Sequence, residues 1–287
     1  MKYCVIDVGS NSVRMLLSEN GKTIKKSARV TGLATGLAAS GVLSEPYMQN
    51  TAAAIAEFKS QGAVFGASKT YVFATAAVRQ SLNSAEFIKK VKTITGLDMD
   101  VIDGKTEARL GAAGALGNSS GGVIDVGGGS AEVVVKRGDE IIYAHSLDTG
   151  AVRLTDAFSD DFSSLDGFLD KKLSEYGVVP EVKFYAVGGT ATSLAAMDME
   201  LEPYDPKRVD GYVIKTSELK RISEKLLQTP LSEREKIKGL QKGRARIIAS
   251  GARLLYRIAE YVRAEEITVK ESDNLEGYLH EKVNAHE

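Results

Sequence analysis

Apolar and polar residues alternate along this chain with two different periods, one typical of strands and one of helices. Short, mainly apolar runs bounded by polar or glycine turns predict strands at residues 70–74, 98–103, 182–187 and 267–269. Longer segments with helical spacing predict helices at residues 44–61, 84–95, 105–116, 151–158, 163–176, 190–197, 217–228, 232–238, 243–263 and 274–284. Strands that alternate with helices favour an α/β protein with mainly parallel sheet and helices on its faces.

One eight-residue segment occurs twice. Residues 5–12 read VIDVGSNS and residues 123–130 read VIDVGGGS, so six of the eight positions are identical. Each copy is followed by a second apolar run and then a hairpin turn, which predicts strand, tight turn, strand, hairpin and strand. One such segment is common and says little, but two copies indicate two domains that begin in the same way.

A run of small residues at 117–122 precedes the second copy and marks the boundary we predict. The chain should therefore comprise residues 1–117 and residues 118–287. We expect the last helix to pack back on the first of these domains.

The amino-acid composition excludes several classes of function. The 287 residues are 43% apolar and 26% charged, which is typical of a soluble globular protein. With 37 Lys+Arg and 38 Asp+Glu the net charge is −1, which excludes a globally basic nucleic-acid binder. One cysteine (Cys4) and three scattered histidines argue against disulfides and a zinc centre. No long apolar stretch suggests a leader or a membrane span, so we expect a cytoplasmic protein.

The two repeated turns carry the candidate chemistry. A strand that ends in Asp-x-Gly and turns back exposes consecutive backbone N–H groups, and such a concavity binds phosphate. The residues we predict to bind phosphate there are Gly9, Ser10, Asn11, Ser12, Gly127, Gly128, Gly129 and Ser130. Asp7 and Asp125 are placed to hold Mg²⁺, or alternatively Mn²⁺, against phosphate oxygens. The alternative is that the two aspartates stabilise their turns and the serines cap them locally.

Six segments together resemble one known family. They read VIDVGSNSVRMLL, ATAAVRQSLN, GKTEARLGAAGAL, VIDVGGGSAEVVV, DTGAVRL and VGGTATSLAA, in family order. Over residues 3–280 the chain resembles the Ppx/GppA phosphatases, which are exopolyphosphatases and guanosine pentaphosphate phosphohydrolases. The resemblance implies two ribonuclease-H-like domains of the actin-like/sugar kinase/Hsp70 (ASKHA) fold around a central cleft, and a homodimer. Longer members carry a C-terminal HD-type region, for which this chain ends too early.

The resemblance also implies catalytic residues. Glu107 matches the family's catalytic carboxylate, and a carboxylate can orient and deprotonate the attacking water. Arg79 matches an arginine whose guanidinium suits a terminal phosphate, and Thr75 and Asn83 are expected on the same wall. Without the resemblance, Glu107 would be an ordinary acid in a first helical turn and Arg79 a surface ion-pair partner.

Residues 188–190 resemble a glycine turn that contacts nucleotide in ATP-using relatives of the fold, although close packing alone would also explain it. The chain departs from the family pattern at Thr106, at Asp103-Gly104 and at the segments Thr75-Ala76-Ala77, Arg244-Ala245-Arg246 and Leu275-Glu276-Gly277. These departures bear on substrate choice and rate rather than on the type of reaction.

A basic run at residues 236–246 contains Lys236, Lys238, Lys242, Arg244 and Arg246 and no acidic residue. It would suit a long phosphate chain, or it is a solvated helix face. Because it has no interleaved aromatic residues, we do not expect nucleic-acid binding.

The sequence leaves four hypotheses for the function. The first is Mg²⁺-dependent release of orthophosphate from inorganic polyphosphate. The second is hydrolysis of guanosine pentaphosphate (pppGpp) by the same residues. An ATP-dependent kinase or ATPase, and a phosphate-chain sensor without turnover, are the more distant alternatives. Turnover of the two substrates in competition would distinguish the first two hypotheses. Phosphate transfer to an acceptor would indicate a kinase, and binding without phosphate release would indicate a sensor.

Overall fold

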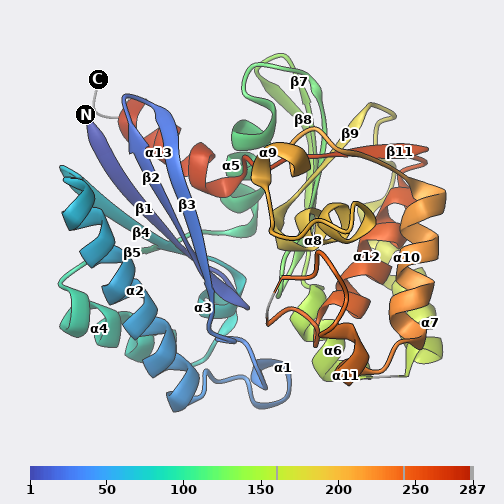
Figure 1. Cartoon of the computed structure of the whole chain (residues 1–287), viewed down its shortest axis with the longest axis horizontal. Coiled ribbons are helices and arrows are strands. Elements are labelled where there is room, and N and C mark those ends of the chain that lie inside the picture. The colour runs from blue at the N-terminus through green and yellow to red at the C-terminus, as the bar shows by residue number, and fades with distance from the viewer. Residues whose placement is uncertain (160, 242, 285–287) are drawn as a thin grey trace.

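The computed structural model describes residues 1–159, 161–241 and 243–284, and its strands form two sheets (Figure 1). The first sheet has the order β3-β2-β1-β4-β5, with β1 (Lys2–Val8), β2 (Ser12–Glu19), β3 (Lys22–Val30), β4 (Lys69–Ala74) and β5 (Met99–Val101). The second has the order β10-β11-β9-β6-β7-β8, with β6 (Gly121–Val126), β7 (Ala131–Arg137), β8 (Glu140–Leu147), β9 (Phe184–Val187), β10 (Val213–Lys215) and β11 (Glu266–Val269).

The repeated sequence produces a repeated topology. In each sheet the repeat forms three antiparallel strands, β1-β2-β3 and β6-β7-β8. In each, the next strand along the chain, β4 or β9, pairs parallel to the first strand of the repeat. Apart from the added edge strand β10, the two orders are the same, and the predicted duplicated ribonuclease-H-like fold is confirmed.

The prediction of mainly parallel sheet is wrong. Among the described residues antiparallel pairings outnumber parallel ones, because each repeat contributes two hairpin pairings and β10 adds another antiparallel edge. Short strands can pair in parallel or antiparallel fashion, and the alternation of strands with helices along the sequence did not distinguish these two arrangements.

Helices cover both sheets. Their bounds are α1 (Leu37–Ser40), α2 (Glu45–Phe65), α3 (Ala76–Gln80), α4 (Ser84–Thr95), α5 (Gly104–Leu116), α6 (Ala151–Phe158), α7 (Phe162–Leu173), α8 (Gly188–Asp198), α9 (Pro206–Val209), α10 (Thr216–Gln228), α11 (Leu231–Arg234), α12 (Ile248–Tyr261) and α13 (Asn274–Asn284). Most long helices match the predicted ranges. The predicted helix 232–238 is shorter and α12 starts later than predicted, while α1, α3, α9 and β10 have too few residues to show a period.

Helices α5 and α13 lie between the two sheets (Figure 1). From α13, Leu275 and Tyr278 pack with Val5 and Phe73 of the first sheet. From α5, one face joins this cluster while Ala108, Ala112 and Leu116 pack against the second sheet. The first sheet is covered on its other side by α2 and α4, and the second by α8 and α12. Along the described residues, no helix has the length and apolarity that a membrane crossing requires.

Glycines allow α5 and α13 to approach so closely. A Cβ added to Gly114 would lie 1.9 Å from the carbonyl oxygen of Asp273, and one added to Gly277 would lie 2.0 Å from the carbonyl oxygen of Leu110. Because both obstacles are backbone atoms, neither can rotate away. The crossing therefore depends on the absence of a side chain at both positions.

The close crossing gives a stability prediction. We expect Gly114→Ala to lower the free energy of unfolding by about 1–3 kcal/mol, the usual cost of overpacking. The matched control is Gly167→Ala on the exposed face of α7, where no atom of the described residues lies within 4 Å of the added Cβ. The control should gain about 0.5–1 kcal/mol, as alanine does over glycine in a helix. Urea denaturation measures both, and an equal effect of the two substitutions would contradict the steric argument.

Candidate active site

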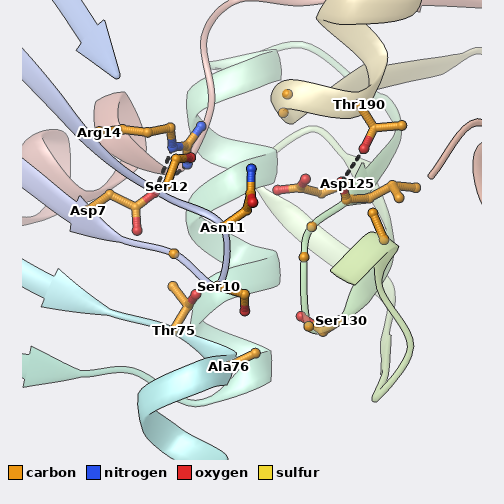
Figure 2. Close-up of a pocket in the computed structure, with 18 of the residues that line it drawn as sticks. Asp7, Ser10, Asn11, Ser12, Arg14, Thr75, Ala76, Asp125, Ser130 and Thr190 are labelled. Atoms are coloured by element: carbon orange, nitrogen blue, oxygen red, sulfur yellow. Dashed lines mark hydrogen bonds and ion pairs between the residues drawn. The ribbon is translucent and has the colours of Figure 1, made fainter. Parts of the chain in front are cut away.

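The two Asp-x-Gly turns meet at the junction of the two sheets and line one cavity. In both copies the turn is closed by the same backbone hydrogen bond, Gly9 N–H to Ser12 O at 3.0 Å and Gly127 N–H to Ser130 O at 3.0 Å. Figure 2 shows Asp7 and Ser10 on one side of this cavity and Asp125 and Ser130 on the other. The repeated sequence therefore gives two matching turns that face each other.

The turns touch closely enough to require glycine. A Cβ on Gly128 would lie 2.7 Å from the Cβ of Ser10, and a Cβ on Gly129 would lie 2.7 Å from the Ser10 hydroxyl oxygen. The predicted residues of the two turns line the cavity together with Glu107; these are Asp7, Gly9, Ser10, Asn11, Ser12, Glu107, Asp125, Gly127, Gly128, Gly129 and Ser130. The structure brings them together without itself testing their roles.

Glu107 enters the cavity from the first turn of α5. Asp103 caps this helix, since its carboxylate accepts a hydrogen bond from the Thr106 N–H at 2.7 Å. The Glu107 side chain is buried, and its Oε2 accepts a hydrogen bond from Arg79 Nη1 at 3.0 Å. Burial raises the pKa of Glu107 above the ordinary value, against the opposing attraction of Arg79. A carboxylate with a raised pKa is a better proton acceptor.

Arg79 lies behind Glu107 rather than in the cavity. Its Nη1 also donates to the carbonyl oxygen of Ile102 at 2.7 Å, and its side chain lines a neighbouring groove with Lys105 and His145. The predicted direct contact of Arg79 with phosphate is therefore not what this geometry offers. The side chain leaves the short helix α3 toward the end of β5, a direction that the sequence does not reveal.

Of the two residues expected beside Arg79, Thr75 lines the cavity and hydrogen-bonds Glu107, but Asn83 does not. Asn83 binds the backbone of Leu43 through both amide atoms, at 2.8 and 2.9 Å, and so fixes the loop that leads into α2. The prediction for Asn83 is wrong because its amide satisfies a buried loop backbone instead.

Asp7 is held by an arginine that the sequence analysis did not select. Arg14 Nε donates to Asp7 Oδ2 at 2.9 Å, and its Nη1 binds Asp273 (Figure 2 shows the Arg14–Asp7 pair). Asp7 Oδ1 is buried and has no hydrogen-bond partner among the described residues. Although Asp273 is buried, Arg14 and Lys26 hold its pKa below the ordinary value. One Asp7 oxygen is thus fixed and the other is left for a ligand.

Asp125 faces the same cavity with more negative than positive neighbours. Desolvation by the surrounding protein raises its pKa to about 7; Arg14 opposes this rise, and the charges of Asp273 and Glu107 add to it. Glu132, two residues after Ser130, is a further buried carboxylate that the sequence analysis missed. Burial raises the pKa of Glu132 well above the ordinary value, and Glu107 and Asp125 raise it further. The sequence signal that could have identified Glu132 was an acidic residue within the otherwise apolar start of strand β7.

This donor set fits a hard cation. The Asp7 Oδ1 atom has no hydrogen-bond partner in the part of the chain that the structure describes, and the Asp125 carboxyl group lines the same cavity. Carboxylate oxygens are ligands that a hard divalent cation prefers. In the described ranges, no three His, Cys, Asp or Glu side chains are grouped to coordinate a metal by themselves. A cation here would therefore complete its coordination with water and with oxygens of a bound phosphate, which is the usual mode of Mg²⁺.

The glycine turn at residues 188–190 closes the far wall. A Cβ on Gly188 would lie 2.6 Å from Asp125 Oδ1, and Thr190 Oγ1 donates to the Val126 carbonyl at 3.0 Å (Figure 2). Gly189 packs directly against the guanidinium of Arg244, which also lines the cavity.

Arg244 is the described member of the basic run 236–246 that reaches the cavity. Lys236 pairs with Glu233 at 2.7 Å, Lys238 pairs with Glu200 at 3.8 Å, and Arg246 pairs with Asp156. Lys242 lies outside the described residues. Solvated ion pairs therefore account for the other described cations of this run, although the run lies between α11 and α12 and not on the helix face that the alternative interpretation predicted.

Comparison with known proteins identifies the family. Residues 17–286 match the model of the Ppx/GppA phosphatase family. A protein of Photobacterium profundum named guanosine-5'-triphosphate,3'-diphosphate pyrophosphatase is 30% identical over 98% of this chain, which spans 59% of that protein. Exopolyphosphatase 2 of Mycobacterium tuberculosis is 25% identical, with 96% of this chain and 97% of that protein covered.

Solved structures agree with this assignment. The Aquifex aeolicus Ppx/GppA family member is 30% identical, with a TM-score of 0.81 and 100% and 98% of the two chains covered. An exopolyphosphatase from Cytophaga hutchinsonii, 23% identical, shares the fold with a TM-score of 0.89 over 99% and 98% of the chains. The duplicated sheets, the facing turns and these matches together show that the chain belongs to the Ppx/GppA phosphatase family.

Proposed function

We propose that this protein is an exopolyphosphatase that hydrolyses the terminal phosphoanhydride bond of inorganic polyphosphate and releases orthophosphate, with Mg²⁺ bound at Asp125 and Asp7. The observation that carries the proposal is the meeting of two amide-lined turns beside a buried carboxylate, Glu107. A homodimer and a cytoplasmic location remain predictions.

Substrate binding would use backbone and side-chain donors of both turns. The Asn11 Nδ2 atom is buried without a hydrogen-bond partner in the described part of the chain, and the Ser10 and Ser130 side chains lie at the cavity. Fixed donors around the equatorial phosphoryl oxygens stabilise the charge that spreads over them in the transition state. A cation at Asp125 would neutralise more of that charge.

Glu107 would act on the water. Its carboxylate orients a water molecule in line with the scissile bond and accepts its proton as the water oxygen bonds to phosphorus. The bridging P–O bond breaks, and its electrons leave with the shortened chain. Arg79 holds the Glu107 carboxylate from behind, so we assign Arg79 a positioning role rather than a substrate contact.

Hydrolysis of pppGpp is the second candidate, since the Photobacterium relative carries a guanosine pyrophosphatase name. The chemistry at Glu107 would be the same, and the two substrates differ in the group attached beyond the terminal phosphates. Orthophosphate release from both substrates, measured in competition with and without Mg²⁺, tests whether polyphosphate is preferred to pppGpp. Equal or faster turnover of pppGpp would reverse it.

The role of Glu107 gives the first prediction for this site. Glu107→Gln keeps the shape but removes the proton acceptor, so we expect turnover to fall at least about 10²-fold, the low end of general-base effects. Polyphosphate binding should remain, because the turns are unchanged. Orthophosphate release and equilibrium binding measure the two, and full activity of the variant would remove Glu107 from the mechanism.

The pairing of Arg79 with Glu107 predicts a pH effect. Arg79 favours the ionised carboxylate, so Arg79→Gln should raise the pKa of Glu107 further, against neighbours Asp7, Asp125 and Glu132 that are unchanged. Because the base must be ionised, the acid limb of kcat should move to higher pH. Arg79→Lys keeps the charge and should move it less. If the acid limb of both variants stays at the pH of the wild-type protein, Arg79 does not act through Glu107.

The proposed cation site predicts opposite effects on activity and stability. Asp125→Asn removes a charged ligand, so the Mg²⁺ concentration for half-maximal activity should rise by about tenfold or more. The same change removes repulsion among Asp125, Asp273 and Glu107, so the melting temperature in EDTA should rise. An unchanged Mg²⁺ requirement would place the cation elsewhere.

A further inference from the structure

Asn274, the first residue of α13, adds a buried amide group to the active-site cavity. Its side chain lines this cavity, and the residue is only 3% exposed. The Oδ1 atom is buried and accepts no hydrogen bond from the described residues. A buried carbonyl oxygen without a partner is costly, so its presence in a cavity points to a ligand that brings a donor or a positive charge.

The start of α13 does not need the Asn274 side chain. Asp273 precedes the helix, and its Oδ1 accepts a hydrogen bond from the Leu275 N–H at 3.1 Å. The N–H of Asp273 in turn donates to Glu276 Oε2 at 3.0 Å, which completes a reciprocal cap. The helix end is therefore satisfied by other residues, and the amide of Asn274 is left to the cavity.

The amide lies on the same side of α5 as Glu107. Asn274 Oδ1 is 2.7 Å from the position that a Cβ on Gly111 would occupy, and Gly111 follows Glu107 by one turn of this helix. Residues four apart in a helix share one face and lie about 5–6 Å apart. The absence of a side chain at Gly111 leaves the space into which the amide oxygen reaches.

Asn274 is also held close to Asp7. Arg14 donates from Nε to Asp7 at 2.9 Å and from Nη1 to Asp273, so one guanidinium holds Asp7 beside the residue that precedes Asn274. Burial is the largest cause of the raised pKa of both Asp7 and Asp125, and the charge of Asp273 contributes to both. The carboxyl groups of Asp7 and Asp125 and the amide of Asn274 therefore surround one part of the cavity.

The atoms left without partners beside Arg14 are oxygens. Asp7 Oδ1 and Asn274 Oδ1 are both buried with no hydrogen-bond partner in the part of the chain that the structure describes. A phosphate oxygen is itself an acceptor and cannot satisfy them, whereas a hard divalent cation binds carboxylate and amide oxygens alike. The amide oxygen would also add a ligand without adding negative charge to a group of repelling carboxylates.

We propose that Asn274 Oδ1 is a ligand of the divalent cation, beside the carboxylates of Asp7 and Asp125. This rests on the proposed function, because it takes the cation to lie at those two aspartates. The amide belongs to the cation rather than to the substrate, so its removal should matter even when no phosphate is present. Asn11 is the matched contrast, because the unpartnered buried atom of this second asparagine in the cavity is the donor Nδ2.

Binding of Mn²⁺ alone, measured by electron paramagnetic resonance without phosphate, tests the proposal. Asn274→Ala should raise the dissociation constant of Mn²⁺ about tenfold or more, since even changes outside the ligands themselves cost about 10–100-fold in metal affinity. Asn274→Asp should bind Mn²⁺ at least as tightly as the wild-type protein, because a carboxylate oxygen replaces the amide oxygen. Asn11→Ala should leave Mn²⁺ binding unchanged, because the free atom of Asn11 is a donor.

Thermal unfolding separates this role from a structural one. In EDTA, Asn274→Ala should not lower the melting temperature, because the substitution removes a buried oxygen that has no partner among the described residues. The rise in melting temperature that Mn²⁺ produces should shrink, because a weaker ligand stabilises the folded state less. A lower melting temperature in EDTA together with an unchanged effect of Mn²⁺ would mean that the amide is structural, and would overturn the proposal.

The binding data also distinguish this inference from the proposed function. Wild-type affinity for Mn²⁺ in Asn274→Ala, or an equal loss in Asn274→Asp and Asn274→Ala, would overturn the assignment of Asn274. If Asp125→Asn weakens Mn²⁺ binding while Asn274→Ala does not, the inference fails and the proposed cation site stands. If the wild-type protein does not bind Mn²⁺, or if Asp125→Asn has no effect, the cation site of the proposed function is itself contradicted.

Discussion

Repulsion among buried carboxylates is the constraint on which this molecule depends. Asp7, Glu107, Asp125, Glu132 and Asp273 converge where the two sheets meet, and desolvation raises the pKa of the first four, whereas Arg14 and Lys26 hold the pKa of Asp273 below its ordinary value. Arg14 offsets Asp7 and Asp273, and Arg79 offsets Glu107. Asp125 and Glu132 have no such close cation among their described contacts, so negative charge accumulates on one side of the cavity. That imbalance supports the proposal that a divalent cation binds in the cavity.

The fold supplies the means to hold these groups together. Helix α5 lies between the sheets, packs on both and carries Glu107 at its first turn, while α13 fixes α5 through a crossing that glycine alone permits. The loop before α13 contributes Asp273, which ties Arg14 and hence Asp7 to the same crossing. The packing of α5 against α13 therefore also fixes the positions of Glu107 and Asp7, the carboxylates to which we assign catalysis and cation binding. Loosening the crossing would move Glu107 and Asp7 relative to Asp125.

The arginines at the site fall into two groups according to their hydrogen-bond partners. Arg14 and Arg79 donate hydrogen bonds to the carboxylates of Asp7 and Glu107, which orients these groups and opposes the rise of their pKa on burial. Arg244, by contrast, lines the active-site cavity and donates a hydrogen bond from Nε to the neutral amide oxygen of Gln241, with the Glu271 carboxylate as a more distant attraction. In a site that handles a polyanion, cations of the first kind set the electrostatics of the catalytic groups, and a cation of the second kind is free to contact the ligand.

The sequence by itself determined the duplication, the two facing turns and the residues that form them, because identical segments such as VIDVG encode the same strand and turn in both copies. The resemblance to a family then pointed to Glu107, which the structure places beside the turns. Only the tertiary structure decided which way the long side chains run. Arg79 lies behind Glu107, Asn83 binds a loop, and Arg244 reaches the active-site cavity from the segment before α12, far from both turns in the sequence. A turn is set by neighbours in sequence, whereas the partner of an arginine is chosen by packing between segments far apart in the chain.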